Sequence, residues 1–285
     1  MHLDCPNSEA LSEIAVNEGW ARVGQLRFGS ATLAGVTELA RASFHSGGEA
    51  LRNAELCLAN LPLPRRILRD VFAMFGGAFE VTRSQAHLFS APTLELWLVR
   101  SSDCIESTEF GLFANRFQRS LTQAGFGLRF PYALSQALIE MTENVVRHSA
   151  VRGAFPAVGV VGYHVVNNAM NYVVADLGRG VLGSLKESDR WQSLTTEADA
   201  LVAAAKDGAT RLPEQTAGDG FRVAFQGFLD REGVLAMRSG DGLVRLHGNM
   251  NGREAEVGNA SPVPGLRVCG QCSLMGQTGE IELIT

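Results

Sequence analysis

The sequence predicts a mixed α/β fold of the α+β kind, with helices covering a sheet. Three features predict it: two consecutive runs with helical spacing in residues 109–149, two β-branched runs in residues 158–175, and further strand-like runs toward the carboxyl end. The chain has 285 residues, of which 46% are hydrophobic and 19% charged, as in an ordinary globular protein. This length suits one large domain or two modest ones.

The first part of the chain, residues 1–106, is predicted to be a mixed α/β region. Turn signals near residues 101–107 place a boundary there, so that residues 107–285 form a second domain. No motif for chemistry occurs in the first part, and its role is not predicted. Its expected elements are helices near residues 9–16, 33–43, 49–60 and 64–75, and an apolar strand at Leu94–Val99.

Two amphipathic helices are predicted next. Aromatic and apolar residues recur at helical spacing from Glu109 to Gln123, and Gly125-Phe126-Gly127 supplies a stop. Pro131 then opens a second helix that runs to about Ser149, because proline suits the first turn of a helix.

Strands and a long insert follow. The runs Val158–Val166 and Asn171–Ala175 flank Asn167-Asn168 and predict a hairpin.

Residues 181–217 are long for a connection between elements and predict a functional lid, with one helix near Glu197–Lys206. The later expectations are a helix at 221–231, strands at 234–238 and 243–247 around a turn at Ser239-Gly240-Asp241-Gly242, and strands at 266–274 and 280–284.

Charge and apolar patterning exclude several classes of protein. The net charge of −5 gives no general attraction to nucleic acid or to an anionic membrane. No apolar run reaches the length of a membrane span, and the first residues lack a secretory signal, so we expect a cytoplasmic protein.

The five cysteines predict neither a disulfide framework nor a metal site. They are scattered apart from Cys269 and Cys272, and on a strand residues three apart point to opposite faces. We therefore expect reduced, structural cysteines.

A polar stripe on the second helix is the first candidate for chemistry. Glu140, Asn144 and His148 are spaced at i, i+4 and i+8, which places them on one side of the helix. Apolar residues occupy the neighbouring faces, so the stripe is either a solvated edge or the wall of a pocket.

Two glycine motifs accompany this stripe. Asp176-Leu-Gly178-Arg-Gly180 directly follows a β-branched run, where a carboxylate can face a ligand while glycines let the backbone pass close to it. Gly218-Asp-Gly220 directly precedes a predicted helix, whose amino-terminal amides suit phosphate. Arg179, inside the first motif, is interpreted as a surface charge.

In this order and spacing, the motifs resemble those of the GHKL superfamily, named for gyrase, heat-shock chaperones, histidine kinases and mismatch-repair ATPases. The resemblance covers residues 107–285 and implies the Bergerat fold, a sandwich of a mixed sheet covered on one face by helices. It also implies that the domain binds ATP with Mg²⁺.

The resemblance implies a role for each matching residue. Asn144 is the magnesium ligand, since magnesium favours oxygen donors, and Asp176 accepts the adenine amino group. Glu140 orients or deprotonates the attacking group. The glycines Gly178 and Gly180 let the backbone approach the base and ribose, whereas Gly218 and Gly220 cradle the phosphates. For His148, as for Arg147, contact with the phosphates and a helix-end contact are both open.

Two departures from the family pattern favour slow chemistry. Arg222 follows the second glycine motif where the family often has a small residue. The last motif, Pro264-Gly265-Leu266, lacks the threonine that usually stands near the adenine. Binding without efficient hydrolysis is the expected consequence.

The resemblance predicts an ATP- and Mg²⁺-binding regulatory protein: an ATP-dependent switch or slow ATPase whose lid orders on binding nucleotide. Whether it is an enzyme stays open. One alternative is a partner-switching serine kinase like the anti-sigma factors, which also carry an acid one turn before the asparagine. Another is an interaction module without catalysis. A sensor histidine kinase is disfavoured, because His87 lacks the following acidic residue. The expected partners are ATP and a protein, with a homodimer left open.

Overall fold

The computed structural model describes residues 2–3, 30–31, 37–38, 41, 87–91, 94–99, 102–149, 159–166, 168–207, 226–228, 231, 233–249 and 252–274. Most of residues 1–86 therefore lie outside the described part, and with them most of the predicted amino-terminal helices. Residues 37, 38 and 41 are helical, in agreement with the helix predicted at 33–43. A short parallel pair joins β1 (His2–Leu3) to β2 (Ser30–Ala31).

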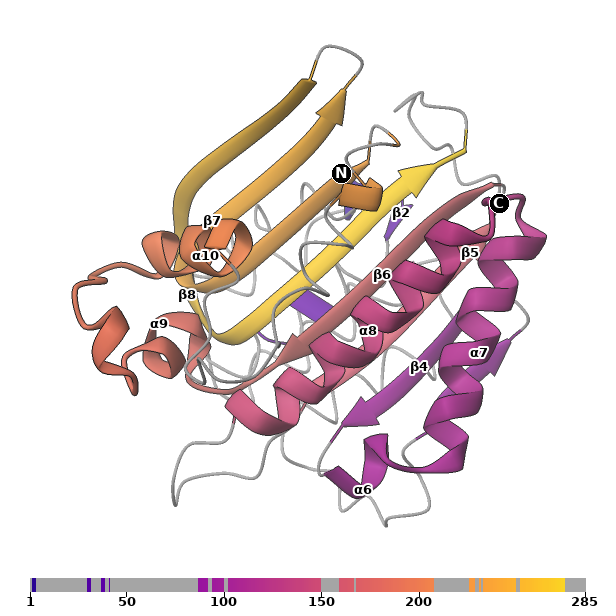
Figure 1. Cartoon of the computed structure of the whole chain (residues 1–285), viewed down its shortest axis with the longest axis horizontal. Helices are drawn as coiled ribbons and strands as arrows, with labels where there is room; N and C mark the ends of the chain where they lie inside the picture. The colour runs from indigo at the N-terminus through magenta and orange to yellow at the C-terminus, as the bar shows by residue number, and fades with distance from the viewer. Residues whose placement is uncertain are drawn as a thin grey trace.

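A six-stranded sheet organises the molecule, in the order β3-β4-β5-β6-β8-β7 (Figure 1). Its strands are β3 (His87–Ala91), β4 (Leu94–Val99), β5 (Gly159–Val166), β6 (Ala169–Asp176), β7 (Val234–Asn249) and β8 (Gly252–Ser273). The predicted α/β class, a sheet covered by helices, is confirmed. All the described pairs in this sheet are antiparallel, whereas the resemblance implied a mixed sheet.

Helices α6 (Ser102–Ile105), α7 (Thr108–Gln123) and α8 (Arg129–His148) follow β4, and α7 and α8 lie side by side over one face of the sheet (Figure 1). Both agree with the predicted helices. The hydroxyl of Ser107 accepts a hydrogen bond from the amide of Phe110 and caps α7, and Gly125 ends it with a φ of 96°. No described helix is long and apolar enough to cross a membrane.

The main core lies between these helices and the sheet. Rings from α7, β4 and β5 pack together, with Phe117 and Tyr163 only 4.7 Å apart between centroids. The inner face of α8 adds apolar side chains that are almost fully buried: Leu134, Ala137, Leu138, Met141 and Val145. This packing fixes the rotation of α8 and so determines which of its residues lie at the edge of the core.

The predicted hairpin is confirmed as β5 and β6. Asn168 sits in the connection with a φ of 61°, a left-handed conformation that asparagine tolerates better than most residues. Every residue of β6 is buried, down to Asp176 at its end. The hairpin thus delivers a carboxylate to the edge of the core.

The described part of the predicted lid is folded into α9 (Gly180–Leu185), a 3-10 turn (Asp189–Trp191) and α10 (Glu197–Asp207). The side chain of Thr196 accepts from the amide of Asp199 and caps α10, which agrees with the helix predicted there. Leu201 of α10 belongs to the hydrophobic core. These residues therefore form a packed layer beside the sheet (Figure 1).

The turn predicted at Ser239-Gly240-Asp241-Gly242 is wrong. Residues 234–249 form one long strand that pairs with β8 throughout, with bulges at Ser239/Gly240 and Gly240/Gly242. Gly240 takes a φ of 52°, and the glycines lie against Glu197 of α10. A bulge bends the strand without reversing it. The strand predicted at 266–274 is the end of β8, and the one at 280–284 lies outside the described residues.

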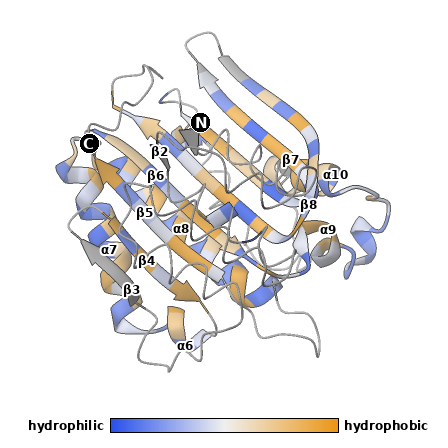
Figure 2. Cartoon of the chain, turned by 180° about the vertical axis from the view of Figure 1, so that it is seen from behind, coloured by the Kyte–Doolittle hydropathy of each residue, from blue (hydrophilic) through white to orange (hydrophobic). Residues whose placement is uncertain are grey.

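The second face of the sheet is buried too. Leu96, Val160, Val173, Ala236 and Cys269 alternate with the core residues of their strands and are each 0% exposed. Viewed from behind, β4 and β5 are largely hydrophobic (Figure 2). Glu38 and Arg41, from the amino-terminal region, contact this face.

The sheet continues across the boundary predicted at residues 106 and 107. Strand β4 pairs along its whole length with β5, and all six of its residues are buried. Glu95 of β4 accepts two hydrogen bonds from Arg116 of α7, at 2.7 and 2.8 Å, and one from the Tyr163 hydroxyl of β5. Residues on both sides of the predicted boundary thus share one core.

The cysteines correct one expectation and bear out another. Cys269 is disulfide-bonded, with its partner outside the described residues, whereas Cys104 and Cys272 are free thiols. The prediction that all the cysteines are reduced is therefore wrong. Cys272 belongs to the core between helices and sheet and Cys269 does not, as expected of residues three apart on a strand.

Candidate functional site

The candidate site lies where β6 ends. Asp176 pairs with Gly159 at the end of the β5–β6 hairpin and is only 6% exposed. Its carboxylate accepts a hydrogen bond from the amide of Gly178, at 2.7 Å, and another from the amide of Leu266. The bond from Gly178, two residues later, forms an Asx turn, and a buried acid whose pKa is shifted by burial is a candidate for a functional site.

Burial raises the pKa of Asp176 to about 6, although the two amides and the positive charge of Arg41 lower it. Burial therefore removes more hydration energy from the ionised carboxylate than the two amides and Arg41 restore. A ligand group that donates to this carboxylate would offset part of that cost.

Gly178 brings the backbone after Asp176 against the end of α8. A Cβ atom at this position would lie 2.4 Å from both the Cα and the carbonyl oxygen of Ser149, which leaves no room for any other residue. The glycine is thus required for packing against α8, whereas the resemblance implied an approach of the backbone to the base and ribose. The atoms it approaches in this structure belong to α8.

Gly180 is required for a different contact. It has a φ of 77°, and a Cβ there would lie 2.7 Å from the Ser239 hydroxyl and 2.8 Å from the Glu197 carboxylate. Ser239 donates to Glu197 at 2.7 Å, and the first amides of α9 donate to the same two side chains. Glu197 and Ser239 were missed in the sequence, because nothing local distinguishes this joint between α9, α10 and β7.

Pro264-Gly265-Leu266, compared above with the last motif of the family, is a bend inside β8 where the register with β7 shifts; this bend, referred to below as the turn, lies directly beside Asp176. Gly265 has a φ of 75°, and a Cβ there would lie 2.0 Å from the carbonyl oxygen of Asp176. The structure thus brings Asp176 and Gly178, at and just after the end of β6, together with Gly265 from inside β8. Leu266 contributes its amide where the family pattern has a threonine.

The stripe of Glu140, Asn144 and His148 lies at the edge of the core. All three residues are half-buried, between the buried inner face of α8 and its exposed outer face. Their side chains present two oxygen-bearing groups and an imidazole along one flank of the helix. Carboxylate and amide oxygens are donors that Mg²⁺ accepts, so Glu140 and Asn144 fit the implied metal by chemistry.

His148, at the end of α8, faces α9. Its Nδ1 lies 3.3 Å from the Ser184 hydroxyl, and its carbonyl accepts from Arg179 Nε at 2.9 Å. This favours the helix-end contact for His148. Arg179 also pairs with Glu187 and is half-buried, so this charge predicted at the surface is held in an ion pair there.

Two neighbouring charges of α8 bind each other. Arg147 and Glu143 form an ion pair of 2.9 Å across one helical turn on the outer side. This contact gives Arg147 a partner away from the stripe.

Gly218 and Gly220, with Arg222, lie outside the described residues. The residues just after them, 226–228, are helical, and Phe228 packs edge-on against Phe130 at the start of α8. The guanidinium of Arg231 lies 3.9 Å from the centroid of the Phe130 ring. The two ends of α8 thus contact the segments that follow the first and second glycine motifs.

No cluster of three His, Cys, Asp or Glu side chains suited to a metal ion occurs among the described residues. A magnesium ion held by Asn144 and phosphate oxygens needs no such cluster.

Comparison of the chain with protein-family models, curated proteins and solved structures found no match.

Proposed function

We propose that this protein binds ATP with Mg²⁺ and acts as a nucleotide-dependent regulatory switch or slow ATPase. The observation that carries the proposal is the buried carboxylate of Asp176, framed by the Gly178 and Leu266 amides near the end of α8. An adenine offers an amino group as a donor, and the Asp176 carboxylate has acceptor capacity for it.

The flank of α8 supplies the phosphate end of the proposed site. Asn144 would offer an amide oxygen to magnesium, which would supply positive charge to the phosphates. Glu140, one turn earlier, would take the proton of the attacking hydroxyl. The attacking oxygen would bond to the γ-phosphorus as the bond from that phosphorus to the bridging oxygen of ADP breaks, and ADP would leave.

The switch in this proposal is a movement of α9 and α10. These helices are already folded, and Glu197 ties them to Ser239 of β7. We therefore assign them a hinged displacement on nucleotide binding. A protein partner that reads this displacement is part of the proposal.

A partner-switching serine kinase is the second candidate. Glu140 favours it, because an acid one helical turn before Asn144 can accept the proton of a serine hydroxyl as readily as that of water. The two activities differ only in the acceptor, and the products separate them: phosphate for an ATPase, a phosphoserine on a partner for a kinase.

A binding module without catalysis is the third. The Asp176 carboxylate already accepts from two amides, and the Pro264-Gly265-Leu266 turn lacks the hydroxyl of the family pattern. This module binds ATP but produces neither ADP nor a phosphorylated partner.

Two substitutions separate the proposed roles. Asp176→Asn puts an amide group where the adenine amino group needs an acceptor, so ATP affinity falls by about tenfold or more. Glu140→Ala leaves affinity within about threefold and removes turnover. ATP affinity measured by calorimetry and ADP release measured with purified protein check both. Equal loss of binding in the two variants contradicts the assignment.

A further inference from the structure

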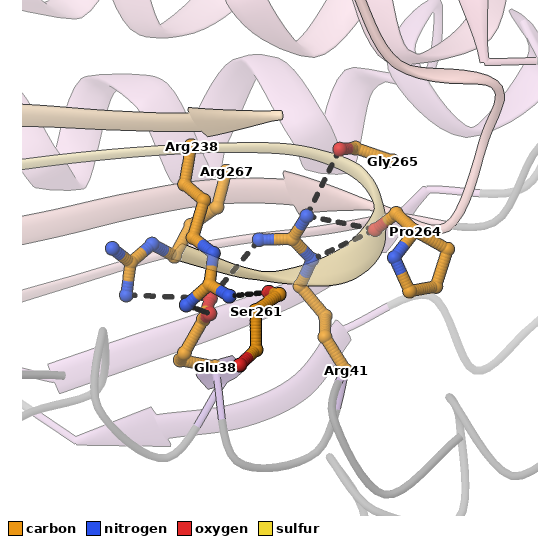
Figure 3. Close-up of polar contacts among 7 residues, drawn as sticks. All are labelled: Glu38, Arg41, Arg238, Ser261, Pro264, Gly265 and Arg267. Carbon is orange, nitrogen blue, oxygen red and sulfur yellow. Dashed lines mark hydrogen bonds and ion pairs between the residues drawn. The ribbon is translucent and has the colours of Figure 1, made fainter. Parts of the chain in front are cut away.

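A cluster of buried charges lies on the face of the sheet opposite α7 and α8. Glu38, Arg41, Arg238 and Arg267 are each 0% exposed (Figure 3). Arg238 of β7 and Arg267 of β8 stand directly opposite each other in the sheet. Glu38 reaches both, with its oxygens 2.5 Å from Arg238 and 3.4 Å from Arg267, so the carboxylate offsets the repulsion of the two guanidinium groups.

Arg41 connects this cluster to the turn beside Asp176. Its Nη1 pairs with Glu38 at 3.0 Å, while its Nη2 donates to the carbonyls of Pro264, at 2.7 Å, and Gly265, at 3.0 Å. Its Nε donates to Pro264 as well, at 3.2 Å. One planar guanidinium thus holds two successive carbonyls of the turn (Figure 3).

The same turn is in contact with the proposed adenine site. Gly265 is so close to Asp176 that no side chain fits between them, and the next amide, from Leu266, binds the Asp176 carboxyl group. Because the turn is held on one side by Arg41 and touches Asp176 on the other, its position determines where that amide points.

We infer that Arg41 is a positioning residue for the nucleotide site, so that the amino-terminal region contributes to a site whose other residues lie within 107–285. The inference rests on the proposed function. Arg41 acts through the Pro264–Gly265 turn, which presents the Leu266 amide to Asp176, and its charge holds Asp176 in the ionised form. The region with no motif of its own thereby sets the affinity for adenine.

The charges around Asp176 support this role for Arg41. Arg238 and Arg267 face Glu38, His148 of α8 faces Ser184, and Arg179 pairs with Glu187. Among the described residues, the cation that lowers the pKa of Asp176 is Arg41, although burial still raises it to about 6. Loss of Arg41 should therefore raise the pKa further.

The test follows Asp176 in the full-length protein by nuclear magnetic resonance. The amide signals of Gly178 and Leu266 report its protonation, because both amides bind its carboxyl group. In the wild type they should titrate with a midpoint near pH 6. In Arg41→Gln the midpoint should rise by about one pH unit, the usual effect of losing a nearby opposite charge.

Arg267→Gln is the matched control. It removes an arginine of the same cluster whose ion pair is with Glu38, so it should destabilise the fold but leave the midpoint unchanged. Equal midpoints in wild type, Arg41→Gln and Arg267→Gln overturn the inference.

If Arg41→Gln does not fold, Arg41→Lys replaces it in the test. A single ammonium group cannot hold both carbonyls, so the Leu266 amide signal should move while the midpoint stays near the wild-type value. An unmoved Leu266 signal overturns the inference.

Titration with ATP and Mg²⁺ separates this inference from the proposed function. Arg41→Lys should weaken ATP binding about tenfold, the worth of one charge-assisted hydrogen bond, whereas Arg267→Gln should not. Absence of ATP binding by the wild type refutes the proposed function and, with it, the nucleotide role of Arg41. The amide titration then still reports whether Arg41 positions the turn.

Discussion

Asp176 and Glu38 are both buried acids, and their surroundings act on them in opposite directions. Asp176 is left with a pKa raised to about 6. For Glu38, burial alone raises the pKa, but Arg267, Arg238 and Arg41 outweigh it and lower the value to about 2. The first acid is destabilised as an ion, which suits a site that awaits a donor. The second is stabilised as an ion, which suits a structural role.

Glu38→Gln should lower the free energy of unfolding by about 3 to 5 kcal/mol at pH 7, since it leaves buried arginines with less opposite charge. The folded-state pKa of Glu38 is depressed from 4.5, so its contribution is complete above about pH 4.5 and is lost as the pH falls toward 2. Urea unfolding of wild type and variant at several pH values checks this.

Glu256→Gln is the control for Glu38. Glu256 pairs with Arg245 at 3.3 Å but is 62% exposed, so its loss should cost less than about 1 kcal/mol. A cost for Glu38→Gln no larger than that of the control, or one that does not shrink in acid, contradicts the structural role.

At the scale of elements, the sequence predicted well where the signal is local. The spacing of Phe110, Phe113 and Phe117 predicted α7, and Asn168 marked the hairpin of β5 and β6. The bulge of β7 was mistaken for a turn, because Gly240 and Gly242 are small to admit Glu197, more than 40 residues away. A glycine required by a distant contact has the same sequence signal as one required by a turn.

Gly178→Ala tests the contact between the first glycine motif and α8. The new Cβ would collide with backbone atoms of Ser149, which cannot move without shifting the end of α8. We expect a loss of about 1 to 3 kcal/mol in the free energy of unfolding. Thermal unfolding measures it.

Gly111→Ala is the comparison for Gly178→Ala. Gly111 lies on the exposed side of α7, with nothing within 4 Å of the added Cβ. Alanine there should be neutral or should stabilise by up to about 1 kcal/mol. Similar effects of the two substitutions would remove the argument that Gly178 is needed for close packing.

At the scale of the whole molecule, the motif-bearing segment depends on residues before it. Strand β4 supplies Glu95 and Trp97 to the core, and Glu38 and Arg41 lie against the second face. The sequence could not predict this. Glu38 and Arg41 look like surface charges, and Arg41 is 223 residues from Pro264, so no pattern of periodicity or spacing relates them.

The sequence predicted the candidate site in part. Asp176, Gly178 and the Gly265 turn come together as the motif order suggests, and Glu140 and Asn144 share one flank of α8. His148 is directed toward Ser184, which spacing alone could not reveal because it depends on where α9 packs.

A fragment of residues 107–285 should not fold cooperatively. It lacks β4, so it exposes the edge of β5, and it lacks Glu38, so Arg238 and Arg267 face each other without that carboxylate. Urea unfolding of the fragment and of the full chain compares them. A cooperative transition in the fragment, with a midpoint like that of the full chain, contradicts the single shared core.

Calorimetric titration of the full-length protein with ATP, with and without Mg²⁺, tests the central claim most directly. We predict binding to the wild type that Mg²⁺ strengthens, and loss of that strengthening in Asn144→Ala, since Asn144 is the proposed magnesium ligand. Absence of ATP binding by the folded wild type, or the same Mg²⁺ effect in Asn144→Ala, would contradict it.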